Sequence, residues 1–88
     1  MPTISVFFGI VIRMYQNDHV PPHFHALYGG EEAQVAIETG DLLKGNLPRV
    51  AQPLVKEWCR LHREELLKNW SKGRARESLE KIDGLDVE

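Results

Sequence analysis

The sequence predicts an α+β domain in which a small, mostly antiparallel β-sheet of three to five strands packs on one long amphipathic C-terminal helix. Two observations predict this class. Apolar and polar residues alternate along the first half of the chain, as they do in half-buried strands. Between residues 49 and 70 the apolar residues recur with the helical period instead. With 88 residues, we expect a single domain over 1–88, ordered at about 3–82 and followed by an acidic tail.

The first expected strands lie on either side of Gly9. Residues 4–8 are apolar, and residues 10–15 alternate. A glycine between them marks either a tight turn or a bulge in one long bent strand, and both topologies stay open. Residues 23–28 and 32–38 are expected to form a hairpin around Gly29 and Gly30. Residues 42–47 fit a short strand or a helical turn, and residues 78–82 are compatible with a last strand.

The expected helix is a single element of about 20 residues within 49–70. Its apolar stripe includes Leu54, Trp58 and Leu66, and its opposite side is basic. Pro53 bends the helix if the helix begins at Pro48, and is an ordinary first-turn proline if the helix begins near residue 52. We expect the stripe to cover one face of the sheet and to leave the other face open to solvent or to a partner.

Composition limits the classes of function. The net charge of −2 divides into −4 over residues 1–43, +6 over residues 44–76 and −4 over residues 77–88. A basic middle segment permits RNA binding without requiring it. No apolar run approaches the roughly 20 residues that cross a bilayer. The single cysteine, Cys59, forms no internal disulfide, so we expect a cytoplasmic protein with no membrane contact.

Residues 17–26 contain three of the four histidines, next to an aspartate and two consecutive prolines. His23 and His25 are two apart in a strand, so they share a face. A rigid turn can fold His19 back beside them. Together with Asp18, these imidazoles would make a mononuclear site for a divalent, zinc-like transition metal.

Two other interpretations of this segment stay open. In the first, His19, His23 and His25 perform metal-free acid–base catalysis and cleave RNA, with Arg13 and Tyr15 supplying charge and orientation. In the second, the segment is architectural, and the histidines bind backbone groups or hold an interface. The sheet face decides between a site and a structural role. We expect a site if the histidines lie on the open face, and a structural role if they lie under the helix.

Residues 17–25 form the specific motif Asn-Asp-His-x-Pro-Pro-His-Phe-His, and further short motifs occur elsewhere in the chain. On these motifs the chain resembles a small bacterial family known only as domain of unknown function 4160. The resemblance extends to about residue 82. The resemblance implies a single small domain. It also implies a gene that often stands beside another gene for a small domain of unknown function, an arrangement similar to toxin–antitoxin modules. The further motifs are residues 2–5, 8–10, 45–48, 57–58 and 62–66.

The sequence and the resemblance together favour one function over two alternatives. The favoured function is a component of a toxin–antitoxin-like two-gene module that binds a small partner protein, with or without homo-oligomerisation. The first alternative is a metal-independent ribonuclease toxin, and the second is a transition-metal-binding domain. Whether the chain is an enzyme is not decided by the sequence.

Overall fold

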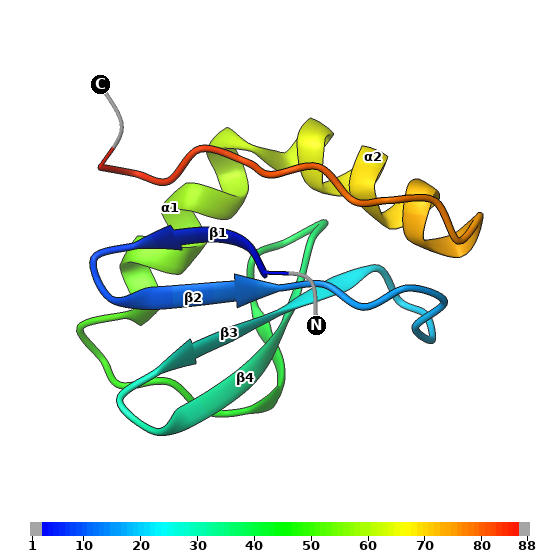
Figure 1. Cartoon of the computed structure of the whole chain (residues 1–88). Coiled ribbons are helices and arrows are strands. Elements are labelled where there is room, and N and C mark those ends of the chain that lie inside the picture. Colours follow the sequence, from blue (N-terminus) through cyan, green and yellow to red (C-terminus); the bar gives the residue numbers. More distant parts are fainter. Residues whose placement is uncertain (1–2, 87–88) are drawn as a thin grey trace.

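The computed structural model describes residues 3–86 and shows an antiparallel sheet beside two helices (Figure 1). The five strands lie in sequence order across the sheet, from β1 to β5. The α+β class is therefore confirmed. The elements are β1 (Thr3–Phe7), β2 (Ile10–Arg13), β3 (His23–Tyr28), β4 (Glu31–Ala36), β5 (Leu42–Gly45), α1 (Gln52–Leu61) and α2 (Arg63–Arg74).

Two tight turns connect the first four strands in pairs. Phe8 and Gly9 join β1 to β2 with φ of 51° and 79°, so these are two strands and not one bent strand. Gly29 and Gly30 join β3 to β4 with φ of 59° and 82°. Positive φ at both central residues suits a two-residue hairpin, because that turn matches the twist of the strands. The hairpin predicted from the glycine pair is confirmed.

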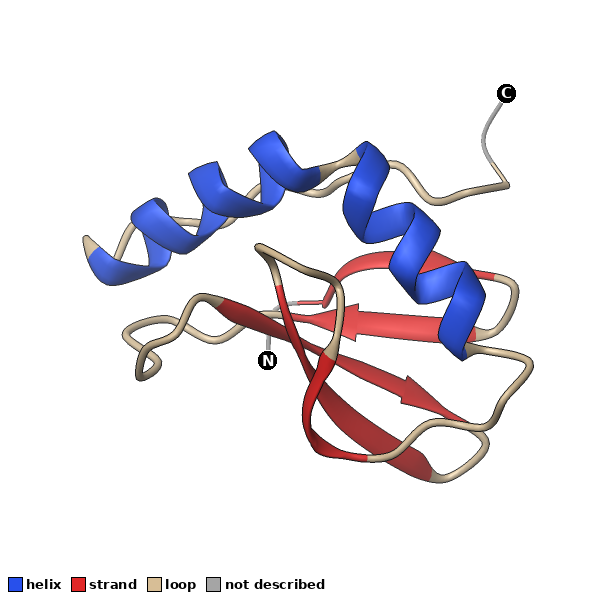
Figure 2. Ribbon diagram, turned by 180° about the vertical axis from the view of Figure 1, so that it is seen from behind, coloured by secondary structure: helices blue, strands red, loops and turns tan. Residues whose placement is uncertain are grey.

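One face of the sheet packs on α1, as expected (Figure 2). Phe24 in β3 meets the indole of Trp58 edge-on, with ring centroids 5.4 Å apart. Phe7 in β1 lies 5.3 Å from the same indole. Ile12 and Val35 are fully buried on this inner face. Alternation along each strand therefore assigns the intervening residues to the outer face.

The prediction of one long helix is wrong, because the helix is divided at His62 (φ −114°, ψ 24°). Figure 2 shows α1 and α2 inclined to each other. No glycine or proline marks the break. The side chains beside it have partners of their own: Arg63 Nε donates to Ile37 O over 2.8 Å, and His62 Nδ1 lies 2.6 Å from Glu65 Oε1. Pro53 is a first-turn residue of α1, as predicted for a helix that begins near residue 52.

Residues 78–82 form no strand. Instead, the side chain of Asn69 in α2 forms hydrogen bonds with both backbone groups of Glu80. Asn69 Nδ2 donates to Glu80 O over 2.8 Å, and Asn69 Oδ1 accepts from Glu80 N–H over 2.9 Å. Those groups are then not available to a strand ladder. The segment makes one bond to β1, from Ile82 N–H to Ile4 O, and Trp58 Nε1 donates to Asp83 O over 2.7 Å. Within residues 3–86, neither helix is long and apolar enough to cross a membrane.

Candidate functional site

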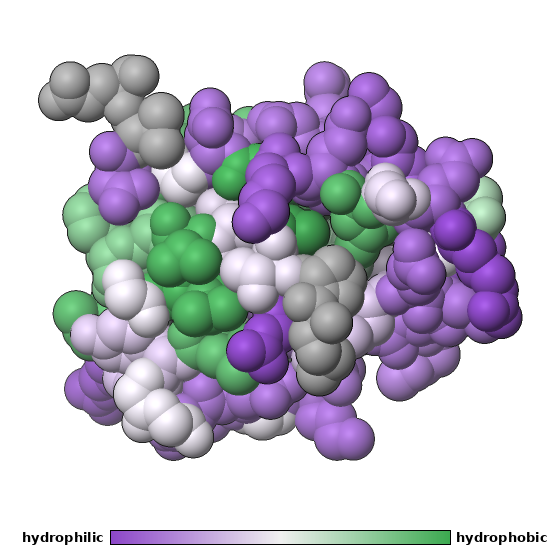
Figure 3. Space-filling model, viewed as in Figure 1, coloured by the Kyte–Doolittle hydropathy of each residue, from purple (hydrophilic) through white to green (hydrophobic). Residues whose placement is uncertain are grey.

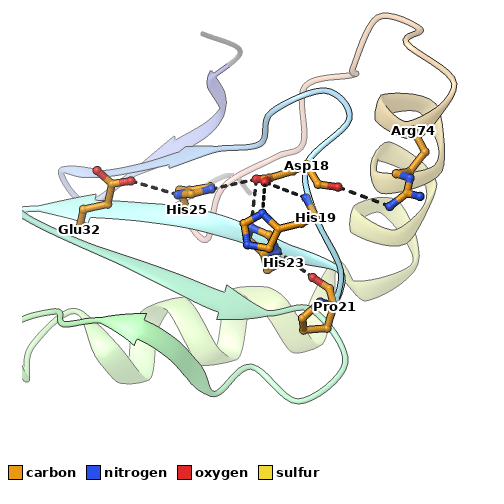
Figure 4. A network of polar contacts seen from close by, with 7 residues as sticks. All are labelled: Asp18, His19, Pro21, His23, His25, Glu32 and Arg74. Carbon is orange, nitrogen blue, oxygen red and sulfur yellow. Dashed lines mark hydrogen bonds and ion pairs between the residues drawn. The ribbon is translucent and has the colours of Figure 1, made fainter.

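The connection between β2 and β3 folds over one end of the sheet and places Asp18 above the start of β3 (Figure 4). Two consecutive prolines restrict the backbone directly before His23. Asn17 has a φ of 56°, which asparagine tolerates well, and its N–H donates to Gly73 O over 2.9 Å. Arg74 Nη1 donates to Asp18 O over 3.4 Å. The end of α2 therefore holds this loop in place.

His23 and His25 lie on the outer face of the sheet. They alternate with Phe24, which packs on α1, and the strand register sets His25 opposite Arg13. This is the face not covered by α1, for which the sequence analysis predicts a site. Both residues are nevertheless buried, with exposed fractions of 1% for His23 and 8% for His25. The indole of Trp70 packs beside the ring of His23, with the two ring centroids 5.4 Å apart. The histidines are thus shielded from solvent without being under α1.

Asp18 is the centre of the site. Its Oδ2 lies 3.0 Å from His23 Nε2 and 3.3 Å from His25 Nε2. Its Oδ1 accepts the backbone N–H of His19 over 2.9 Å and lies 3.0 Å from His19 Nδ1. Burial of the carboxylate tends to raise its pKa, but the bond from His19 N–H, the bond from His25 and the nearby imidazoles outweigh this. The pKa of Asp18 is therefore below its ordinary value.

The other nitrogen of each buried ring faces an acceptor. His23 Nδ1 lies 2.8 Å from Pro21 O, and His25 Nδ1 lies 3.0 Å from Glu32 Oε2. A carbonyl and a carboxylate can only accept, so in a neutral ring these bonds place the one proton on Nδ1. The donor atoms of Asp18, His23 and His25 all lie within 4.8 Å of one another. Such a set can hold a cation or share protons.

For three of the four residues predicted as metal ligands, the structure brings the ligand atoms within 4.8 Å of one another. The fourth, His19, lies beside them with its ring centroid 5.4 Å from that of His23, but its side chain is 75% exposed and contacts the other oxygen of Asp18. Tyr15, one of the predicted catalytic residues, meets the ring of His25 edge-on at 4.6 Å. Arg13 is the strand partner of His25. Both therefore lie beside His25.

Glu32 is a residue of the site that the sequence analysis did not identify. A signal was present. A two-residue turn at Gly29 and Gly30 fixes the register of β3 and β4, with Leu27 opposite Glu32. This register makes Glu32 a diagonal neighbour of His25 on the same face, within reach of a long side chain. No pattern in the sequence indicates the contacts of Trp70 with His23 and of Arg74 with Asp18, because these contacts depend on the placement of α2.

A second feature of the outer face is a row of apolar side chains across three strands. The register pairs Val6 with Val11 and Val11 with Leu27. Val6 is 56% exposed, and Phe8 in the adjoining turn is 55% exposed. Figure 3 shows apolar side chains gathered over the β1–β2 hairpin. We call Val6, Phe8, Val11 and Leu27 the outer apolar row.

The comparisons with known proteins give a family and no activity. A family model described as "Domain of unknown function (DUF4160)" matches residues 9–71, which is 63 of the 88 residues. The match includes β2 to β5, α1, most of α2 and all of residues 17–26. No curated protein and no solved structure matches the chain.

Proposed function

Because the chain belongs to the family described as domain of unknown function (DUF4160), whose description assigns no activity, we propose a function from the molecular surface. The chain binds a small partner protein through the outer apolar row, as one component of a toxin–antitoxin-like two-gene module. The observation that carries this proposal is the register of Val6, Val11 and Leu27 beside an exposed Phe8. The gene arrangement that the family resemblance implies supports the two-gene part.

The physical argument is that apolar side chains gathered on one face favour burial against a partner. Single exposed apolar residues are ordinary on protein surfaces, but contiguous groups rimmed by polar residues are typical of interaction sites. Exposed aromatic residues such as Phe8 are also typical of interface centres. The outer apolar row fits this pattern.

Charge indicates the kind of partner. Residues 1–43, which contain the whole row, carry one basic side chain and five acidic ones. Complementary charge steers association and disfavours wrong partners. We therefore expect a small protein whose apolar contact surface is bordered by Lys and Arg. The cytoplasm is the proposed compartment, which the single, buried and unpaired Cys59 supports.

The test is co-expression of the chain with the product of the neighbouring gene, followed by size-exclusion chromatography. We expect one peak that contains both chains. Val6→Glu places a charge in the row and should weaken the complex at least tenfold. Leu61→Glu is the matched control, because Leu61 is 53% exposed on α1, away from the row. Two separate peaks at micromolar concentration, or an equal effect of the two variants, would contradict the proposal. A homodimer disrupted only by Val6→Glu would assign the row to a second copy instead.

The geometry gives less support to the ribonuclease alternative. RNA cleavage needs imidazoles that reach the substrate, and His23 and His25 are buried. Several cations of the basic middle segment are already paired: Lys56 with Asp41 at 3.1 Å and Arg60 with Glu57 at 2.6 Å. The alternative remains a prediction. It requires growth arrest and RNA cleavage on expression, both lost when His23 and His25 are replaced by alanine.

A further inference from the structure

We propose that Asp18, His23 and His25 bind one divalent transition-metal ion of the zinc class, independently of the partner surface. Asp18 Oδ2 and the two Nε2 atoms are the ligands. The ligand set differs from the one predicted from the sequence, because His19 is not included. The inference begins from the protonation of the two buried rings.

His23 provides the first step. Its Nδ1 donates to Pro21 O, so a neutral His23 has its lone pair on Nε2. That Nε2 is buried and has no hydrogen-bond partner among residues 3–86, although Asp18 Oδ2 lies only 3.0 Å away. The ring direction at Nε2 does not meet Oδ2 with hydrogen-bond geometry, so no proton lies between the two atoms, and their lone pairs repel each other at this distance. A cation bound by both atoms turns that repulsion into attraction.

His25 repeats the arrangement from the neighbouring position on the strand. Its Nδ1 faces Glu32 Oε2 at 3.0 Å and its Nε2 faces Asp18 Oδ2 at 3.3 Å. A neutral imidazole has one proton and cannot donate to both carboxylates. Donation to Glu32 leaves the Nε2 lone pair directed at Asp18 Oδ2. The two rings together place two Nε2 lone pairs beside one carboxylate oxygen.

The separations suit a shared metal ion. Zinc bonds to nitrogen and oxygen are about 2.0–2.2 Å long, so neighbouring ligands of a tetrahedral ion lie about 3.4 Å apart. The two nitrogen–oxygen separations of 3.0 and 3.3 Å are close to this value, and all three donor atoms lie within 4.8 Å of one another. Two imidazoles and one carboxylate are donors that zinc and its neighbours in the first transition row accept.

The groups behind the ligands are those that a metal site requires. Ligating histidines commonly donate their second N–H to a backbone carbonyl or a carboxylate, which fixes the ring. Pro21 O and Glu32 take these roles for His23 and His25. His19 N–H holds the other oxygen of Asp18 and leaves Oδ2 for the metal. The charges of Asp18 and Glu32 together balance a divalent ion. A fourth ligand, such as water, would complete a tetrahedron.

The experiment uses untagged protein from which metal has been removed with a chelator. Zn²⁺ is titrated by calorimetry, and Co²⁺ by its visible absorption. We expect one ion per chain, and at least 100-fold weaker binding for Asp18→Asn and His25→Gln. His19→Gln and His62→Gln are the controls and should stay within about threefold of the wild type. Comparable weakening in His19→Gln would overturn the three-ligand set.

A second measurement keeps the test decisive if a ligand variant fails to fold. In wild-type protein, nitrogen-15 spectra of the imidazoles should show Zn²⁺ moving the Nε2 resonances of His23 and His25 and leaving those of His62 in place. No binding at millimolar Zn²⁺ would overturn the proposal and leave protonated imidazoles paired with Asp18 as the explanation. Val6→Glu should bind Zn²⁺ like the wild type, so failure of the partner proposal and failure of this one are distinguishable.

Discussion

The indole of Trp70 lies against the imidazole of His23, with ring centroids 5.4 Å apart. Trp70 belongs to α2 and His23 opens β3, so the contact joins the second helix to the outer face of the sheet. Asn17 N–H, which donates to Gly73 O, adds a backbone bond in the same place. Both halves of the predicted single helix contribute to the core, α2 through Leu66 and Trp70. In addition, α2 closes the histidine site.

Removal of Trp70 should open this closure. We expect Trp70→Ala to lower the free energy of unfolding by about 3 kcal/mol, because a buried tryptophan loses its packing. Leu67→Ala, at an exposed position on the same helix, should cost less than about 1 kcal/mol. Urea denaturation measures both values. Equal losses would show that the contact between α2 and His23 contributes nothing measurable.

Asn69 should be needed to hold residues 78–82 against α2. It is fully buried, and its two bonds to Glu80 are the only ones found for that side chain in residues 3–86. We expect Asn69→Leu to cost about 2 kcal/mol, because the backbone groups of Glu80 lose their partners. Hydrogen exchange at the amides of Glu80 and Ile82 should accelerate by more than tenfold. Leu67→Ala, at an exposed position on the same helix, is the control, and unchanged exchange in Asn69→Leu would contradict the role of Asn69.

The parts of the fold that could be predicted are those that local chemistry determines. The glycine pair at 29–30 sets a hairpin and its register, and from that register Glu32 could have been placed beside His25. The break at His62 could not be predicted, because no glycine or proline marks it and the bond beside it, from Arg63 Nε to Ile37 O, joins residues far apart in the sequence. The burial of His23 under Trp70 could not be predicted either, because the two residues are 47 positions apart in the sequence. Motif spacing identified Asp18 and the histidines but could not separate His19 from the other two.

Cys59 should react slowly with thiol reagents. The thiol is fully buried, and its Sγ lies 3.3 Å from Ile37 O. Burial raises the pKa of Cys59 above its ordinary value, and the nearby Arg63 only partly opposes this. Because the thiolate is the reactive form, we expect labelling by a disulfide reagent at pH 8 to be at least 100-fold slower in native protein than in urea-unfolded protein. Rapid labelling of the native protein would show that the junction between α1 and the sheet opens readily.

Gly45 and Gly30 allow backbone strain to be separated from steric crowding. Both have positive φ, 77° and 82°, so alanine at either site pays a similar conformational cost of about 1–2 kcal/mol. A Cβ at Gly30 would meet nothing within 4 Å. A Cβ at Gly45 would overlap the backbone oxygen of Glu32 and lie 3.1 Å from Ala33 Cα.

We therefore expect Gly45→Ala to cost at least about 2 kcal/mol more than Gly30→Ala in urea denaturation, since the overlap must be relieved by shifting β5 away from β4. The bond from Asn46 N–H to Glu32 O, 3.2 Å long, should weaken at the same time. The amide of Asn46 would then exchange faster in Gly45→Ala and stay protected in Gly30→Ala. Similar losses of stability in the two variants would mean that positive φ alone accounts for the glycine at position 45, and that β5 adapts to the added methyl group.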